Sequence, residues 1–371
     1  MFFNKNDKIG QYTVVFPHTQ GVYAETYRVK NENGKTCFLK LINYSKLSRT
    51  QIDDGRIIEV EIVKQLNHHN LCQFLNCGEL IVNGQKYAYF VTEYISGETL
   101  SQRLIRDDEL SVYEIKQIAI AVLSALSFLH SRKMPIIHNE VSIQNLMLDF
   151  TGNFSDLKLI DFGNACYLSQ PPAKPDLQKI NPFYLAPERF SGVCSVQSDL
   201  YAVGAVIYRL LYGKLPWFCD ISNIKPRERI EVILAERDKD LNIPSIDMFE
   251  LDDQFINTII KVLSYDVDDR FKSADEFIKA INGEIKVERQ STQRKIFSNV
   301  SGQETSKISV VKKKGNGFAA IAGMEDLKQR LREEVIEPLN NPEEYKRYGV
   351  SIPNGMLLYG PPGCGKTFFA K

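Results

Sequence analysis

The sequence lacks the features of a secreted, membrane-spanning or nucleic-acid-binding protein. Lys plus Arg and Asp plus Glu both number 46, so the formal net charge is zero and no whole-chain field attracts an anionic partner. None of the seven cysteines forms a CxxC pair, and residues 1–10 hold no apolar segment of signal-peptide length. The longest mainly apolar run, residues 118–129, is shorter than the roughly 18 residues that cross a bilayer. We therefore expect a cytoplasmic protein with reduced thiols, no membrane or nucleic-acid partner, and a buried helix at 118–129.

The chain has the composition of an ordinary globular protein, with 43% apolar and 25% charged residues among 371. This length allows roughly two domains. Residues 286–316 differ from the rest in composition, because they contain eight basic and two acidic residues and few large apolar side chains. The remaining charges leave residues 1–285 at −6, with 31 basic and 37 acidic residues, and residues 317–371 neutral. We predict a domain at 1–285, a solvated basic linker at 286–316 and a further segment at 317–371.

The first part of the chain alternates strand and helix patterns before it becomes mainly helical. An Asn33-Gly34 turn joins two of the strand-like runs, and Ile58, Ile62 and Leu66 recur near helical spacing. Five strands are predicted, at residues 11–16, 23–30, 36–42, 74–80 and 87–93.

Helix-start signals appear twice in the later part of this domain. Ser111 and Glu114 form a capping-box pair before a predicted helix at 112–131, and either Ser195 or Ser198 can start another that runs through Leu211. The fold class is therefore α+β, with a small β-rich part followed by helices.

Three short motifs lie between these helices in a fixed order. Each alone recurs by chance, but the set and its spacing are specific. They read His138-Asn139-Glu140 with Asn145 five residues later, Asp161-Phe162-Gly163, and Ala186-Pro187-Glu188.

On these motifs, residues 10–283 resemble a eukaryotic-type protein kinase domain. The resemblance implies two lobes, at about 1–94 and 98–285, with ATP and Mg²⁺ between them, and an enzyme that phosphorylates hydroxyl side chains. It also implies that Arg270 pairs with the glutamate of the third motif.

The resemblance assigns catalytic and metal-binding roles to four more side chains. Lys40 would meet the ATP phosphates, and Glu59 would hold that lysine by an ion pair. Asn145 and Asp161 would supply the oxygen ligands that Mg²⁺ prefers.

The expected nucleotide site combines family features with departures from them. Thr92 occupies the gatekeeper position, and the backbones of Glu93 and Ile95 would contact the adenine edge. Only Gly21 remains of three usual glycines, because Thr19 and Ala24 occupy the other two positions, and a Cβ limits approach to phosphate.

A further departure places Phe38 where a small residue usually covers the adenine. The ring either closes the adenine pocket or stacks on the base, and the sequence leaves both possibilities open. We expect weak ATP binding.

The catalytic loop departs from the family in the same region. Glu140 stands where an aspartate is usual, so the carboxylate is kept but displaced by about an ångström, which can cost on the order of 10²-fold in rate. Asn139 replaces an arginine that receives activation-loop phosphate, so we expect no switching by that route. Ser142 and Asn181 replace the usual lysine and threonine. The loop predicts a slow kinase rather than an inactive one.

The last segment contains a P-loop after the strand-like residues 356–359. A GxxxxGKT sequence in that position cradles phosphate with backbone N–H groups, and it resembles the start of an AAA-family ATPase module. The nucleotide-binding residues that this resemblance implies are Gly360, Gly363, Gly365, Lys366 and Thr367. Since no Walker B strand follows, we expect an incomplete, inert α/β fragment. It is either a vestigial domain or, as we favour, the start of a module in a longer kinase–AAA fusion.

Three hypotheses for function follow. The first is a slow Ser/Thr-type phosphotransferase that acts on a protein substrate or on Ser and Thr of its own linker. The second is a catalytically impaired pseudokinase that regulates or recruits to an AAA ATPase, and the third is a remodelling ATPase whose motor is cut short. An AAA oligomer is expected only if the full module exists.

Overall fold

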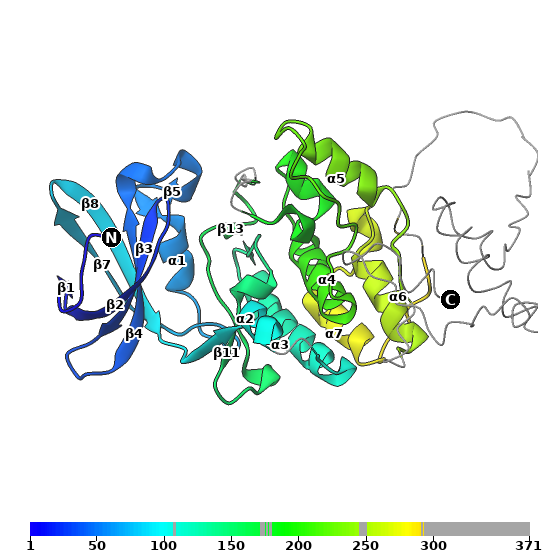
Figure 1. Cartoon of the computed structure of the whole chain (residues 1–371), viewed down its shortest axis with the longest axis horizontal. Helices are drawn as coiled ribbons and strands as arrows, with labels where there is room; N and C mark the ends of the chain where they lie inside the picture. The colour runs from blue at the N-terminus through cyan, green and yellow to red at the C-terminus, as the bar shows by residue number, and fades with distance from the viewer. Residues whose placement is uncertain are drawn as a thin grey trace, which may run out of the picture. The chain divides into compact units, whose positions relative to one another are not determined.

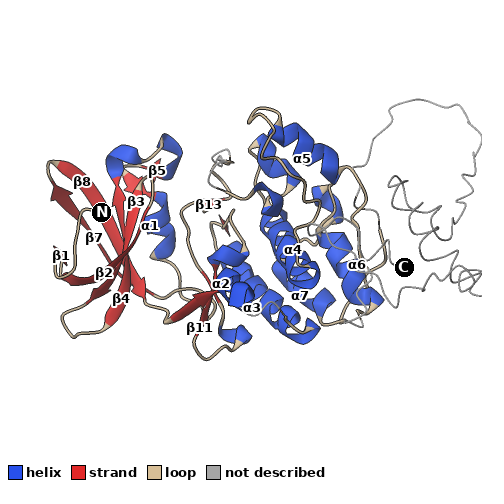
Figure 2. Ribbon diagram, viewed as in Figure 1, coloured by secondary structure: helices blue, strands red, loops and turns tan. Residues whose placement is uncertain are grey.

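The computed structural model describes residues 1–106, 109–170, 175, 177, 180–244, 251–290 and 292. The chain divides into two units, Met1–Phe297 and Ser298–Lys371, and every described residue belongs to the first. This unit has a β-rich lobe at its N-terminal end and a helical lobe that follows (Figures 1 and 2). The two-lobed α+β expectation is confirmed for this part of the chain.

The N-terminal lobe is built on an antiparallel six-stranded sheet in the order β1-β2-β3-β4-β8-β7. The five predicted strands are present, and a short edge strand precedes them. Strand β2 reaches Gln20 rather than Phe16, so the loop to β3 is only Gly21–Tyr23. The strands are β1 (Lys8–Ile9), β2 (Tyr12–Gln20), β3 (Ala24–Lys30), β4 (Thr36–Asn43), β7 (Phe74–Val82) and β8 (Gln85–Glu93).

The predicted helix of this lobe is shorter than its apolar pattern. Helix α1 covers Ile58–Val63, and Ile57 lies before it in strand β6 while Leu66 follows it as a buried loop residue. Both residues are buried in the core. The apolar spacing therefore predicts which residues are buried, but it does not predict where the helix begins and ends. The connection from β4 to α1 holds η1 (Tyr44–Lys46), η2 (Arg49–Gln51), β5 (Ile52–Asp53) and β6 (Arg56–Ile57).

The C-terminal lobe is organised around helices α3 and α4, which pack side by side. Helix α3 begins after Ser111 with the predicted capping box to Glu114. Helix α4 begins after Ser195, which resolves the choice between two serines, and ends at Gly213 with φ +67°. The helices are α2 (Leu100–Arg106), α3 (Val112–His130), α4 (Val196–Tyr212), α5 (Arg229–Arg237), α6 (Asp253–Val262) and α7 (Ala274–Ile281).

Helix α3 is the one described helix that is long and apolar enough to cross a membrane by length and composition. Its apolar residues, however, are largely buried in this lobe against α4 and α7. It therefore has the character of a core helix, as the sequence predicts for residues 118–129.

Short strands and turns connect the helices and carry the three motifs. Strand β10 pairs with β13, and β11 pairs with both β9 and β12, which brings the first two motifs together. These elements are β9 (Gly97–Thr99), β10 (Ile136–Ile137), η3 (Ile143–Asn145), β11 (Leu146–Asp149), η4 (Phe154–Asp156), β12 (Lys158–Leu159), β13 (Cys166–Tyr167), η5 (Pro182–Tyr184), η6 (Pro187–Ser191) and η7 (Val267–Asp269).

The folded unit extends beyond the predicted boundary at 285. Val287 is buried in the main core, where its backbone N–H donates to Gln254 Oε1 at 3.0 Å. Thr292 is 2% exposed, and its hydroxyl oxygen accepts the Leu241 N–H at 2.9 Å. Val287 and Thr292 thus pack against the helical lobe, although both lie within the predicted solvated linker. The rest of the predicted linker and the segment 317–371 lie outside the described residues.

Candidate active site

Lys40 is the centre of the charged cluster between the two lobes. It lies in β4 between Thr26 of β3 and Phe90 of β8. Its Nζ donates to Glu59 Oε1 at 2.6 Å and to Asp161 Oδ1 at 3.0 Å. Burial would lower the pKa of Lys40, but the charges of Asp161 and Glu59 outweigh this and hold it well above its usual value. Lys40 is therefore a fixed cation, and the predicted ion pair with Glu59 is confirmed.

Asp161 reaches this cluster from the loop after β12, with a left-handed backbone of φ +62°. The charge of Lys40 holds the pKa of Asp161 below its usual value although burial opposes this effect. The side chain also accepts the Gly163 N–H at 3.2 Å. A permanent carboxylate thus stands beside the lysine, as a metal ligand requires.

Helix α4 holds the catalytic loop through one buried carboxylate. Asp199 accepts the backbone N–H of His138 and of Asn139, each at 2.8 Å, and it also lies 3.0 Å from His130 Nε2. Burial would raise the pKa of Asp199, but these partners keep it below its usual value. The charged Asp199 therefore fixes the backbone just before Glu140.

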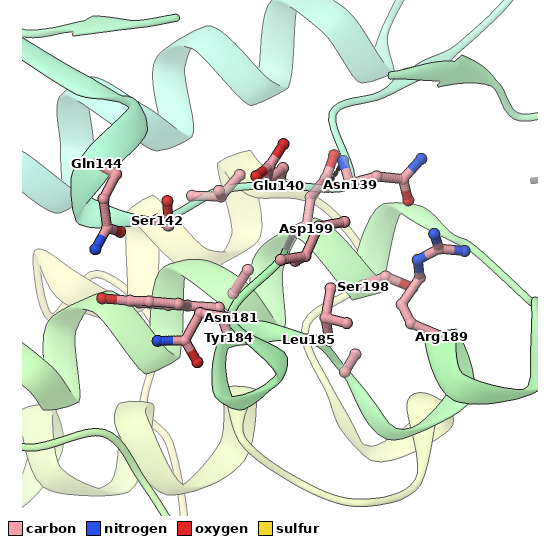
Figure 3. A pocket seen from close by; sticks show the side chains of 14 residues that line it. Asn139, Glu140, Ser142, Gln144, Asn181, Tyr184, Leu185, Arg189, Ser198 and Asp199 are labelled. Atoms are coloured by element: carbon pink, nitrogen blue, oxygen red, sulfur yellow. Dashed lines mark hydrogen bonds between the residues drawn. The ribbon is translucent and has the colours of Figure 1, made fainter. Parts of the chain in front are cut away.

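Glu140 lies at the junction of two cavities. One cavity of about 670 Å³ is lined by Lys40, Gly21, Glu59 and Asp161, and a second of about 250 Å³ by Ser142 and other residues of the catalytic loop and the turn before α4. Glu140 lines both. Figure 3 shows its carboxylate at the upper edge of the smaller cavity, above the Tyr184 ring.

The Glu140 carboxylate is held by a residue that the sequence reasoning missed. Asn164 Nδ2, directly after the second motif, donates to Glu140 Oε2 at 2.7 Å. Burial raises the pKa of Glu140 to about 7, and the Asn164 hydrogen bond opposes this rise. A carboxyl group with that pKa is suited to accept a proton near neutral pH.

Asn145 lies next to Glu140 rather than in the lining of the larger cavity. Its Nδ2 donates to the Glu140 backbone oxygen at 2.9 Å. The amide nitrogen is used in this bond, so Oδ1 is the atom that would coordinate a metal. Asn145 Oδ1 and the Asp161 carboxylate are oxygen donors of the kind that Mg²⁺ prefers, and their role as metal ligands stays a prediction.

Tyr23 of the β2–β3 loop covers the lysine, which the sequence reasoning also missed. Its ring lies 5.7 Å from Lys40 Nζ, and its hydroxyl lies directly against Gly163, where any side chain would collide with it. Burial raises the pKa of Tyr23 to about 12, so this hydroxyl stays neutral. Gly21 lies in the same loop and lines the same cavity.

The expected adenine-contacting residues form the end of β8 and the chain that follows it. The Glu93 carbonyl accepts the Thr92 hydroxyl at 3.2 Å, and the Glu93 carboxylate lies 3.0 Å from Lys158 Nζ. Neither Glu93 nor Ile95 is among the residues that line the larger cavity. Their predicted contact with adenine stays a prediction.

Phe38 pairs with Thr92 across β4 and β8, beside an aromatic group at the lobe surface. Its ring lies 6.5 Å from that of His18, which stacks on Tyr94 at 6.2 Å. Phe38 is thus half-buried with the His18 ring near it, and both interpretations of its role stay open.

The third motif is fixed by the ion pair that the sequence predicts. Arg270 donates to Glu188 through Nη1 at 2.8 Å and Nη2 at 2.9 Å, and its side chain is fully buried. Asn181 does not brace the catalytic carboxylate through a hydrogen bond that the structure records. It instead caps η5 by accepting the Phe183 N–H at 3.1 Å.

Comparison with known proteins decides the family. The protein kinase domain model matches residues 18–280. The chain belongs to the protein kinase family. The match covers both lobes, so the kinase fold and its enzyme class are confirmed for this domain.

Serine/threonine kinases are among its relatives. A probable serine/threonine-protein kinase CCRP1 of Zea mays is 30% identical over 56% of this chain and 32% of its own length. The probable serine/threonine-protein kinase PknB of Lactococcus lactis is 26% identical over 75% of this chain and 45% of its own. The serine/threonine-protein kinase ULK3 of Xenopus laevis is 31% identical over 53% of this chain and 41% of its own length. This kinase chain spans less than half the length of each of these relatives.

Gly360, Gly363, Gly365, Lys366 and Thr367 lie outside the described residues, so the structure places no part of the predicted P-loop. The family match also ends before them.

Proposed function

We propose that this domain transfers the γ-phosphoryl group of Mg-ATP to serine and threonine hydroxyls of proteins. The observation that carries the proposal is the position of Glu140 between the Lys40 cavity and the smaller cavity. A nucleotide held at Lys40 and an acceptor hydroxyl held in the smaller cavity would meet at this carboxylate. Phosphoryl transfer needs this positioning more than covalent chemistry.

We propose that the larger cavity binds Mg-ATP through groups already charged and oriented. Lys40 would neutralise phosphate charge, while Asp161 and Asn145 Oδ1 would hold the metal, and Gly21 leaves room for backbone approach. The adenine would lie along Glu93 and Ile95. When bound, Mg-ATP supplies the activated phosphoryl group and the charge neutralisation of the transfer.

Glu140 would orient the acceptor hydroxyl and take its proton. Its pKa of about 7 means that it is charged in a large fraction of molecules at neutral pH. The hydrogen bond from Asn164 to Oε2 would restrict rotation of the Glu140 carboxylate. This restriction would offset part of the positional freedom that the extra methylene of glutamate adds.

We propose that transfer is slow. Tyr23 lies over Lys40 and against Gly163, so it must move or let the phosphates pass beside it when ATP binds. This same contact favours the alternative function, a pseudokinase that regulates a partner, because Tyr23 occupies space beside Lys40 that the phosphates would need.

Serine and threonine hydroxyls of the predicted linker are proposed acceptors in addition to other proteins, since tethering raises their effective concentration. Thr292 is excluded from this set because it is buried and hydrogen-bonded. The remaining candidates are Ser291, Ser298, Ser301, Thr305, Ser306 and Ser309.

For residues 317–371 we propose a nucleotide-binding AAA-type segment, on the strength of the sequence GPPGCGKT alone. Its test is Lys366→Ala in the full chain. If Lys366→Ala leaves the ATPase rate unchanged, the segment hydrolyses no ATP, as expected. If Lys366→Ala lowers the ATPase rate and Asp161→Asn does not, that expectation is contradicted.

The kinase proposal is tested by phosphopeptide mapping of the full chain with Mg-ATP and a Ser/Thr-rich protein acceptor. We expect phosphoserine and phosphothreonine to accumulate slowly, and to disappear in Lys40→Ala and Glu140→Ala. A matched control is Lys86→Ala, an exposed lysine of β8 that pairs with Glu79. Equal phosphorylation in all variants, or none in the parent, would favour the pseudokinase.

A further inference from the structure

Two thiols meet beneath the catalytic loop. Cys166 in β13 and Cys194, just before α4, have their Sγ atoms 3.7 Å apart. They are 9% and 8% exposed and form a small apolar cluster with Ile137, packed against Val196. All the described cysteines are free thiols. Among them, the structure records a sulfur–sulfur contact for Cys166 and Cys194.

The pair brackets a stretch of chain that contains the third motif and nearly everything between it and the second. Cys166 lies three residues after Gly163, and Cys194 lies six residues after Glu188, so 28 positions separate them in sequence. Strand pairing also sets Cys166 opposite Ile137, the residue before the catalytic loop. A bond between the sulfurs would therefore close a loop whose ends flank the active site.

Asn139 connects the thiols to the catalytic carboxylate. Its Nδ2 lies 3.3 Å from Cys166 Sγ and also donates to the Asn164 backbone oxygen at 3.1 Å. Asn139 has a left-handed backbone of φ +64° and immediately precedes Glu140. Asn164, in turn, holds Glu140. A change at Cys166 thus reaches both residues that position the carboxylate.

We propose that Cys166 and Cys194 form a dithiol site for hydrogen peroxide, and that the resulting intrachain disulfide lowers phosphotransfer reversibly. The activity part rests on the proposed kinase function. The site would serve in place of phosphate switching, since Asn139 stands where the phosphate-receiving arginine is expected.

The chemistry balances with peroxide as the oxidant. The Cys166 thiolate attacks one peroxide oxygen, the O–O bond breaks, and the departing hydroxide takes a proton to become water. The Cys194 sulfur then attacks the sulfenic sulfur of Cys166, so the S–S bond forms and the S–O bond breaks. The second hydroxide takes the Cys194 proton and leaves as water. The two thiols lose two electrons, which reduce the peroxide.

Cys166 is the thiol that peroxide meets first. It lines the larger cavity, whereas Cys194 does not belong to that lining. Hydrogen bonding from Cys194 lowers the pKa of Cys166, with further help from the Asn139 amide and the charge of Arg189 against the effect of burial. A thiolate is the reactive form, so the attacking and resolving roles are distinct.

Disulfide formation must move the active site. The sulfurs have to approach from 3.7 Å to about 2.0 Å, and this movement displaces the Cys166 sulfur that accepts the Asn139 amide at 3.3 Å. A displacement of about an ångström at a catalytic group can cost on the order of 10²-fold in rate. We expect at least a tenfold fall in phosphotransfer.

The experiment treats the full chain with hydrogen peroxide, removes the peroxide with catalase, and measures two quantities in each sample. Alkylation and peptide mapping report the Cys166–Cys194 linked peptide, and phosphate transfer reports activity before and after dithiothreitol. We expect the linked peptide, the tenfold loss and full recovery on reduction. Cys194→Ser should keep its activity in peroxide, and Cys219→Ser, which removes an unpaired half-buried thiol, should respond as the parent does.

Each readout can overturn a distinct claim. Absence of the linked peptide from oxidised protein refutes the dithiol site whether or not the protein is an active kinase. A linked peptide without loss of activity, or equal loss in Cys194→Ser, refutes the regulatory effect. No transfer by the reduced parent refutes the proposed kinase function instead, and leaves the peptide map to decide the site.

Discussion

Removal of the Asn164 amide should move the pH dependence of catalysis in a defined direction. Its Nδ2 donates to Glu140 Oε2 at 2.7 Å, and a hydrogen bond to the charged form of an acid lowers its pKa. Bonds to charged groups contribute about 1.5–3 kcal/mol, and we take the lower end because this pair is partly exposed. At about 1.4 kcal/mol per pKa unit, Asn164→Ala should raise the pKa of Glu140 by about one unit from about 7.

The sign of the effect follows from the role of the carboxylate. Protonated Glu140 cannot accept a proton, so activity falls as the pH drops through its pKa. The pH profile of kcat/KM for ATP, which reports groups of the free enzyme, should therefore show its acid limb near pH 7 in the parent and about one unit higher in Asn164→Ala. Asn153→Ala is the matched control, because the recorded hydrogen bonds of the Asn153 side chain go only to Ser155 and Asp156 of η4. An acid limb that stays in place, or moves to lower pH, would refute the assignment of Asn164 to Glu140.

Three further predictions concern stability, metal and adenine. Arg270→Ala should lower the free energy of unfolding by about 3–5 kcal/mol in urea titration, because Glu188 would be left buried without its partner; a change below about 1 kcal/mol would contradict this. Asp161→Asn should remove the Mg²⁺ dependence of ATP binding in calorimetry, and unchanged dependence would move the metal site elsewhere. Phe38→Ala should strengthen ATP binding if the ring closes the pocket, whereas weaker binding would show that it stacks on the base, and unchanged affinity would exclude both.

The sequence predicts the part of the site that depends on residue type and spacing. Lys40 on a central strand, Glu59 on the following helix and Asp161 in a specific tripeptide were all assigned, and the structure brings them together. The Glu188–Arg270 pair was assigned in the same way. The sequence predicts the strands because runs of β-forming residues and the Asn33-Gly34 turn are signals carried by neighbouring residues.

The remaining features depend on tertiary contacts that leave no local signal. Asn164 is an ordinary polar residue until the fold sets it beside Glu140, and Cys166 meets Cys194 across 28 positions. Helix α1 is shorter than its apolar pattern because buried residues on both sides of it are extended or in turns. Tyr23 lies within the loop that has lost two of its usual glycines, and only the structure shows that its ring lies near Lys40.

The most direct test of the account is phosphate transfer by the full chain with and without the Glu140 carboxylate. Parent and Glu140→Ala proteins would be incubated with Mg-ATP, with ATP binding measured in parallel and phosphorylated serine and threonine counted by mass spectrometry. We predict that both proteins bind ATP and that only the parent transfers phosphate. Equal transfer by the two proteins, or binding without transfer by either, would contradict a kinase that works through Glu140.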